Sequence, residues 1–104
     1  MNHETAIRAT WHRLKARFPT AVVLILLGDF YEAFDDDAST VSDVCDVVLC
    51  SRKIAPNTRI PMAGFPDFTI EARIKELVDA GHRVVVAEGV GQRTIYEPEQ
   101  LTLC

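Results

Sequence analysis

The first stretch of the chain carries apolar residues at helical spacing. They recur at i, i+4, i+7 and i+11, as expected for an amphipathic helix, at positions Ile7, Trp11, Leu14 and Phe18. Pro19 ends the pattern, because the residue before a proline is disfavoured in helical backbone. We therefore expect a helix over residues 4–17 that buries one face.

A second helix is predicted over about residues 36–45. Asp35 precedes this helix, and Asp36 and Asp37 are its first residues. These three aspartates would supply an N-cap and a negative first turn, which the helix dipole favours. The positions expected to face the core are Ala38, Val41, Val44 and Cys45.

A third helix is predicted over residues 70–80, with Asp67 or Thr69 as its cap. Gly81 follows it, where the end of a helix favours a residue that tolerates left-handed backbone. The positions expected to face the core are Ile70, Ile74, Leu77 and Val78.

Continuous apolar runs alternate with these helices. Residues 21–27 contain no polar side chain, which is typical of a strand buried on both faces at the centre of a sheet. Residues 51–58 are polar, contain Pro56 and Asn57, and are expected to form a loop. Further strands are predicted at residues 47–50, 59–63, 83–88 and 93–96. The pattern predicts an α+β (mixed α/β) fold, with a single mixed sheet of about five or six strands packed with about three helices.

Length and composition fit a single domain. The chain has 104 residues, of which 48% are hydrophobic and 25% charged, so we expect residues 1–104 to form one module. The longest apolar run is far shorter than the roughly 20 residues that a membrane helix needs. The first residues show no signal-peptide pattern, and we expect a cytoplasmic protein. The net charge of −4 argues against strong autonomous binding to nucleic acid.

The cysteines and histidines suggest no metal site. Cys45, Cys50 and Cys104 form no C-x-x-C pair, so we expect reduced thiols, the first two in the core and the third in the tail. His3, His12 and His82 lack ligand spacing.

Residues 28–34 leave three interpretations open. In the first, Phe30 and Phe34 belong to the core, and Asp29 and Glu32 are solvated acids of a turn. In the second, these acids and the aspartates at 35–37 bind magnesium through hard oxygen ligands. In the third, Phe30 is an apolar wedge that enters unstacked bases, and Glu32 hydrogen-bonds a base.

The same residues carry a resemblance to a known family. Residues 28–34 read Gly-Asp-Phe-Tyr-Glu-Ala-Phe and resemble the Gly-Asp-Phe-Tyr-Glu-Leu-Phe segment of MutS domain I, the N-terminal mismatch-recognition domain of a bacterial DNA mismatch repair protein. Further segments resemble that domain in the same order and spacing, at residues 14–19, 36–38, 49–52, 60–66 and 84–88. The resemblance covers about residues 10–92 and implies the MutS domain I fold.

The resemblance implies roles for individual residues. Phe30 would stack into the duplex at a mispaired or unpaired base, and Glu32 would hydrogen-bond the displaced base. Such a step has lost pairing and stacking energy, so it bends at lower cost than a paired step. Arg52, and less directly Lys53, would contact the phosphate backbone. A loop that approaches the groove of the duplex would contain Met62, Ala63 and Gly64.

The resemblance also sets the expected partners. They are double-stranded DNA with a mismatch or an unpaired base and, besides it, other MutS-type domains or a protein partner; the oligomeric state is left open. The chain has no G-x-x-x-x-G-K-[ST] phosphate loop, so we expect no enzyme activity and no cofactor, with ATP binding confined to other domains. A divalent-metal nuclease is disfavoured, because Asp67 and Glu71 are too close in sequence for two strands to present them.

An alternative is a protein-interaction module that keeps the fold without mismatch sensing. Asp67 and Phe68 stand where the family usually has Tyr-His, and an acid there would repel phosphate. This departure and the net charge favour the alternative.

Overall fold

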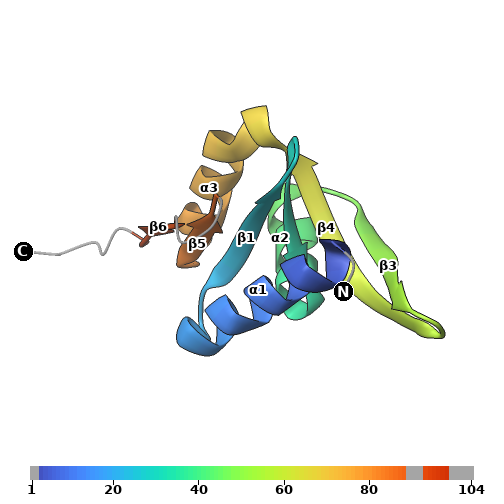
Figure 1. Cartoon of the computed structure of the whole chain (residues 1–104). Coiled ribbons are helices and arrows are strands. Elements are labelled where there is room, and N and C mark those ends of the chain that lie inside the picture. Colours follow the sequence, from blue (N-terminus) through green and yellow to red (C-terminus); the bar gives the residue numbers. More distant parts are fainter. Residues whose placement is uncertain (1–2, 89–92, 99–104) are drawn as a thin grey trace, which may run out of the picture.

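A single six-stranded sheet forms the centre of the computed structural model, which describes residues 3–88 and 93–98 (Figure 1). Cys104 lies outside the described residues. The helices are α1 (His3–Arg17), α2 (Asp35–Cys45) and α3 (Ile70–Asp79), with a 3-10 turn η1 at Asp67–Thr69. The strands are β1 (Val22–Leu27), β2 (Phe30–Phe34), β3 (Leu49–Ala55), β4 (Thr58–Pro66), β5 (Val84–Ala87) and β6 (Arg93–Tyr96). The predicted fold class is confirmed.

The strand order is β3-β4-β2-β1-β5-β6. Among the strands of residues 3–88 and 93–98, only β1 and β5 pair in parallel; every other neighbouring pair is antiparallel, so the sheet is mixed. The predicted strand at residues 93–96 forms and pairs with β5. The central position of β1 explains its unbroken apolar sequence, because alternate residues enter the cores on both faces of the sheet.

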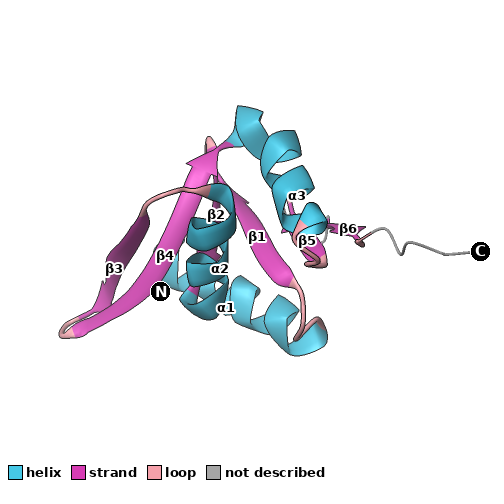
Figure 2. Cartoon of the chain, turned by 180° about the vertical axis from the view of Figure 1, so that it is seen from behind, coloured by secondary structure: helices cyan, strands magenta, loops and turns pink. Residues whose placement is uncertain are grey.

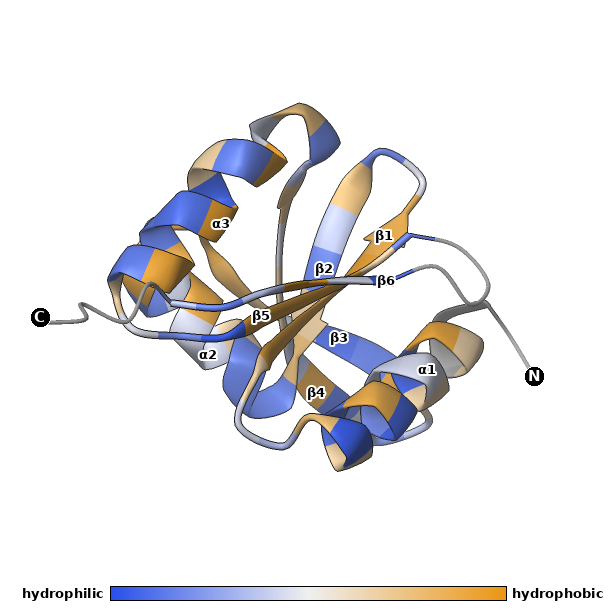
Figure 3. Ribbon diagram, turned by 90° about the vertical axis from the view of Figure 1, so that its left-hand side faces the viewer, coloured by the Kyte–Doolittle hydropathy of each residue, from blue (hydrophilic) through white to orange (hydrophobic). Residues whose placement is uncertain are grey.

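The helices divide between the two faces of the sheet. Helix α1 packs in front of it in Figure 1, and its Trp11 and Leu14 are buried against Val23, Ile25 and Val85. Helices α2 and α3 cover the other face, which is turned to the viewer in Figure 2. Figure 3 shows the sheet between these two layers. The core on the second face includes Ala38, Val41, Leu77, Leu24 and Phe65.

The predicted loop over residues 51–58 is wrong. Strand β3 continues to Ala55 and pairs with β4, and only residues 56 and 57 form the turn, where Asn57 has a φ of 60°. The turn signal was placed correctly, but the polar residues before it belong to an edge strand that is largely exposed. Strand β4 likewise runs on to Pro66, three residues beyond the predicted end of this strand at residue 63.

The predicted side-chain caps of α2 and α3 are also wrong. Phe34 precedes α2 and makes no capping hydrogen bond, while the Asp35 carboxylate accepts a hydrogen bond from Arg8 at 3.1 Å. Thr69 precedes α3, but its hydroxyl donates to the carbonyl of Pro66. Gly81 follows Ala80, the C-cap residue of α3, and has a φ of +94°, as predicted. Asp35 and Asp37 lie in the first turn of α2, and their carboxylates bind Arg8 and Lys15 of α1.

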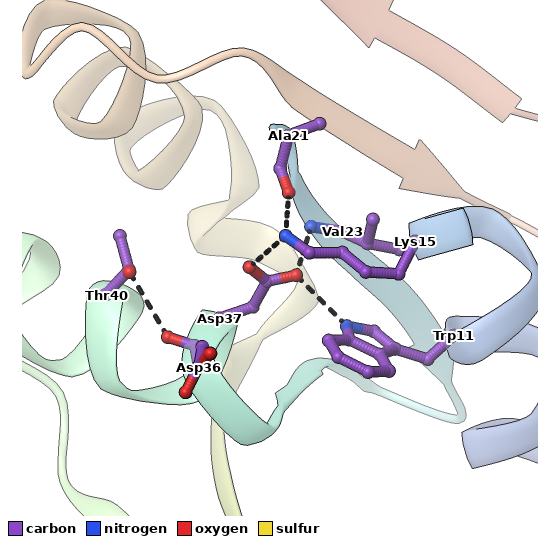
Figure 4. A network of polar contacts seen from close by, with 7 residues as sticks. All are labelled: Trp11, Lys15, Ala21, Val23, Asp36, Asp37 and Thr40. Carbon is purple, nitrogen blue, oxygen red and sulfur yellow. Dashed lines mark hydrogen bonds and ion pairs between the residues drawn. The ribbon is translucent and has the colours of Figure 1, made fainter. Parts of the chain in front are cut away.

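The carboxylate of Asp37 joins α1, β1 and α2 (Figure 4). Only 3% of this residue is exposed. Its Oδ2 accepts hydrogen bonds from the indole N–H of Trp11 at 3.2 Å and from the backbone N–H of Val23 at 3.0 Å. Its Oδ1 accepts from Lys15 Nζ at 2.7 Å, and Lys15 also donates to the carbonyl of Ala21. A buried charge is tolerated when it is paired and hydrogen-bonded in this way.

Replacing Asp37 with alanine is expected to destabilise the fold severely. The change removes the acceptor of two buried N–H groups and the charged partner of Lys15, which costs about 3 kcal/mol or more of unfolding free energy. Urea unfolding followed by circular dichroism measures the change. Asp36→Ala is the matched control, because this neighbour is exposed, and its loss should stay within about 1 kcal/mol. Equal losses in the two variants would contradict the role given to Asp37.

Candidate nucleic-acid interface

A tight turn places Phe30 at the start of β2. Gly28 has a φ of +59°, a left-handed conformation that favours glycine, and it joins β1 to β2 with only Asp29 between it and Phe30. The backbone N–H of Asp67 donates to the carbonyl of Asp29 at 2.7 Å, which ties the turn to the end of β4. Phe30 lies opposite Leu27 and Pro66 and is 45% exposed, so it is not part of the core.

The alternation of β2 separates its side chains between the two faces. Tyr31 and Ala33 enter the core under α2 and α3, and Phe34 enters the core under α1. Phe30 and Glu32 therefore lie on the same face as Phe34. Glu32 is only 7% exposed, so the interpretation of Glu32 as a solvated turn acid is wrong.

Arg52 approaches the Glu32 carboxylate from β3. The distance from Arg52 Nη2 to Glu32 Oε1 is 3.7 Å, and strand β4 lies between the two strands that carry them. The side chain of Arg52 remains 32% exposed. The guanidinium of Arg52 therefore lies beside the nearly buried carboxylate of Glu32 and is also accessible to solvent.

Gly64 leaves room for both side chains on β2. It lies opposite Glu32, and a Cβ atom at this position would be 3.0 Å from the carbonyl oxygen of Tyr31 and 3.4 Å from Glu32 Cγ. The same Cβ would lie 3.7 Å from the ring of Phe30. Any larger residue would press on the backbone of β2, so glycine fits this position.

A shallow groove of about 540 Å³ collects most of the predicted site residues. Five of them line it: Phe30, Glu32, Arg52, Met62 and Gly64. The other two do not. Ala63 is fully buried between Ala33 and Leu49. Lys53 pairs with Arg59 and is adjacent to Arg52 along β3, so its side chain lies on the opposite face of the hairpin.

Sequence reasoning missed several residues of this region. Asp46, Val47 and Val48 lie between α2 and β3 and line the groove, as does Cys50. Arg59 also went unnoticed; its guanidinium donates to the hydroxyl and to the carbonyl of Ser51. Only the pairing of β3 with β4 brings these residues to the groove or to the hairpin beside it.

The β3–β4 hairpin is basic within an acidic chain. Residues 49–66 contain Arg52, Lys53 and Arg59 and no acid, although the whole chain has a net charge of −4. The hairpin projects from the body of the domain (Figures 1 and 2). A count of charge by segment would have revealed this basic region where the total charge concealed it.

The described residues include no cluster of three or more histidine, cysteine or acidic side chains that could hold a metal ion. Asp35 and Asp37 form ion pairs with Arg8 and Lys15. Within the same part of the chain, no helix is long and apolar enough to cross a membrane.

Two of the cysteines have opposite environments. Cys45 is buried as predicted, and desolvation, followed by the nearby charge of Glu76, raises the pKa of its thiol to about 11. Cys50 is exposed, so the prediction that it lies in the core is wrong. It is opposite Met62 on the outer strand of the hairpin, where its side chain borders the groove.

The sequence is similar to a known protein family and to proteins of known name. The family model of MutS domain I matches residues 5–99. The DNA mismatch repair protein MutS of Salinibacter ruber is 38% identical over 86 residues, which cover 83% of this chain and 10% of that protein. The DNA mismatch repair protein MutS of Roseiflexus sp. strain RS-1 is 43% identical over 90 residues, covering 77% of this chain and 8% of that protein. The chain spans about a tenth of the length of these relatives.

Thiol labelling is expected to distinguish the two cysteines. In a Cys104→Ser background, a maleimide at neutral pH should modify Cys50 and leave Cys45 unmodified, because a buried thiol with a raised pKa presents little thiolate. Peptide mass spectrometry measures both sites, and the protein in urea provides the control in which both cysteines react. Rapid labelling of Cys45 in the folded protein would contradict its burial.

Proposed function

The chain belongs to the MutS domain I family, and on this premise we propose that it is a DNA-binding module that recognises mispaired or unpaired bases. It would act as part of a MutS-type mismatch repair protein or as a free-standing relative of that domain. The observation that carries the proposal is the half-exposed ring of Phe30 above a groove that also holds Glu32 and Arg52.

Phe30 would serve as the wedge. An aromatic ring that enters a base step must unstack it, which costs a few kcal/mol and kinks the duplex. A mispaired step has already lost part of that energy, so the cost of insertion is lower there. A half-exposed ring on a strand, held by the tied turn before it, needs little rearrangement to make this contact. The selectivity would come mainly from the deformability of the DNA.

Glu32 would contact the displaced base. Its carboxylate can accept a hydrogen bond from a base N–H, and Arg52 at 3.7 Å provides a countercharge at the site. The same carboxylate repels the phosphates of a duplex that offers no such donor. Glu32 would therefore lower affinity for matched DNA as well as support binding to mismatched DNA.

The hairpin cations would supply contacts to phosphates. Arg52 borders the groove, while Lys53 and Arg59 extend the positive charge across the other face of the hairpin. Such contacts position the protein without reading sequence. Gly64 would let the duplex approach closely, and Met62 would form part of the apolar floor of the groove. Ala63 would support this floor from inside the sheet.

Full affinity would require partners. Three hairpin cations in a chain of charge −4 give a small electrostatic contribution. Other domains of a MutS-type protein, a second copy or a partner protein would supply the remaining contacts. ATP binding would likewise reside in other domains, and a repair protein of this kind would act in the cytoplasm, beside the chromosome.

Substitution of Phe30 tests the wedge. Phe30→Ala should weaken binding to a duplex with one mismatch by about tenfold to a hundredfold, the value of one lost aromatic–base stack, and change binding to the matched duplex little. Fluorescence anisotropy at low salt with two duplexes of equal length measures both affinities. Phe68→Ala is the matched control, because this residue is 84% exposed and does not line the groove.

The outcome of that experiment separates the two candidate functions. A mismatch preference that disappears in Phe30→Ala and persists in Phe68→Ala supports DNA sensing by this module. Equal, weak binding to both duplexes that neither variant changes would favour the protein-interaction module, which keeps the fold without mismatch sensing.

Substitution of Glu32 tests the role of its charge. Glu32→Gln should strengthen binding to the matched duplex by about three- to tenfold, because a phosphate-repelling charge is removed, and so reduce the preference for the mismatch. Asp46→Asn is the matched control, since it removes a charge from the same groove at a residue in left-handed backbone, which asparagine tolerates. The same gain in both variants would show general repulsion instead of a role specific to Glu32.

A further inference from the structure

The edge of the sheet farthest from the basic hairpin carries a second, larger groove. It has a volume of about 890 Å³ and lies between α3 and β6. Strands β3 and β4 lie at one end of the strand order and β6 at the other, so this groove is remote from the groove that holds Phe30 (Figure 2). The two grooves are therefore separate surfaces of the domain.

The floor of this groove is apolar. Ile74 and Val78 contribute from α3, where both are only partly buried, and Tyr96 contributes from β6. Ile95 borders the groove, but it pairs with Val85 of the core under α1, so its side chain lies on the other face of the sheet. Tyr96 is 37% exposed. Large exposed apolar side chains that gather around a groove mark an interaction site more often than scattered ones do.

The helical layer on this face stops short of β6. Helix α2 packs against β4, β2 and β1, and α3 packs against α2 and β5. All four residues of β6 remain exposed. Neighbouring helices lie about 8–10 Å apart and strands about 4.8 Å apart, so one helix covers about two strands. A further helix beside α3 would cover β6 and the apolar floor.

The rim of the groove is acidic. Glu71, Asp79 and Glu97 line it together with a single cation, Lys75. Lys75 forms an ion pair with Asp79, and Arg83 forms one with Glu97, but all four side chains are substantially exposed, and exposed pairs contribute little. A bound cation can therefore compete for these carboxylates. The same acids repel the phosphates of nucleic acid.

We propose that the groove between α3 and β6 is a docking site for a cationic amphipathic helix of a partner polypeptide. The apolar face of that helix would lie on Ile74, Val78 and Tyr96, and its lysine or arginine residues would face Glu71 and the other acids of the rim. The domain would then engage nucleic acid at its basic edge and a polypeptide at its acidic edge. The two activities are separable by mutation.

A direct titration tests the proposal. The probe is a synthetic amphipathic helical peptide of about five turns, with leucine on one face and lysine on the other. Fluorescence anisotropy with the full chain should show binding that weakens as salt is added. Glu71→Lys should weaken it by about five- to tenfold, and Tyr96→Ser by about tenfold.

Matched controls separate docking from general attraction between a cationic peptide and an acidic protein. Asp43→Lys makes the same charge change at an exposed position on α2, outside the groove, and should change binding less than twofold at moderate salt. Val78→Ser repeats the apolar test at a half-buried residue of α3, with circular dichroism checking that each variant is folded.

The proposal is overturned by any of three results. Asp43→Lys weakens binding as much as Glu71→Lys does, or both folded apolar variants bind the peptide as wild type does, or a peptide with glutamate in place of lysine binds equally well. None of these results bears on the mismatch preference of Phe30, which lies in the other groove.

Discussion

The buried carboxylate of Asp37 is the interaction on which the rest of this structure depends. It binds an indole N–H and an ammonium from α1 and a backbone N–H from β1, while belonging to α2 itself. Strand β2 connects β1 to α2 along the chain, so the elements at both of its ends are held by one charged group. Because β2 carries Phe30 and Glu32, this network fixes the frame in which the candidate site forms.

Within that frame, strand alternation decides what each side chain can do. Phe34 anchors its end of β2 in the core under α1, and the residues two and four positions earlier therefore share that face. Glu32 becomes nearly buried beneath Arg52, whereas Phe30 at the strand end stays half exposed. Gly64 on the neighbouring strand leaves the space that both side chains occupy. The positions of the proposed wedge and of the proposed base-contacting carboxylate follow from the register of one five-residue strand.

The distribution of charge makes the acidic total compatible with the proposed nucleic-acid role. Positive charge collects on the β3–β4 hairpin at one edge of the sheet, and carboxylates surround the groove beside β6 at the other edge. Electrostatic attraction acts over roughly one Debye length, about 8–10 Å at physiological salt, so each edge presents its own potential to a partner. The total charge of −4 is therefore a poor guide to what either edge binds.

The sequence by itself determined the fold class, the central strand, the inward faces of the helices and the resemblance to MutS domain I. Each of these features follows from a short stretch of sequence. A continuous apolar run indicates a strand buried on both faces, and helical spacing indicates a helix buried on one face. Motifs in the right order and spacing indicate a family. Tertiary structure alone decided that Asp37 is buried, that Cys50 is exposed, that the polar segment after Cys50 is a strand, and that Lys53 lies on the opposite face from Arg52. Each of these outcomes depends on which residue of a distant segment lies opposite in the folded chain. A shift of one residue in strand pairing moves every side chain of that strand to the other face. Pairing between distant segments has no local signature, and for this reason the groove around Phe30 could be assembled only from the folded chain.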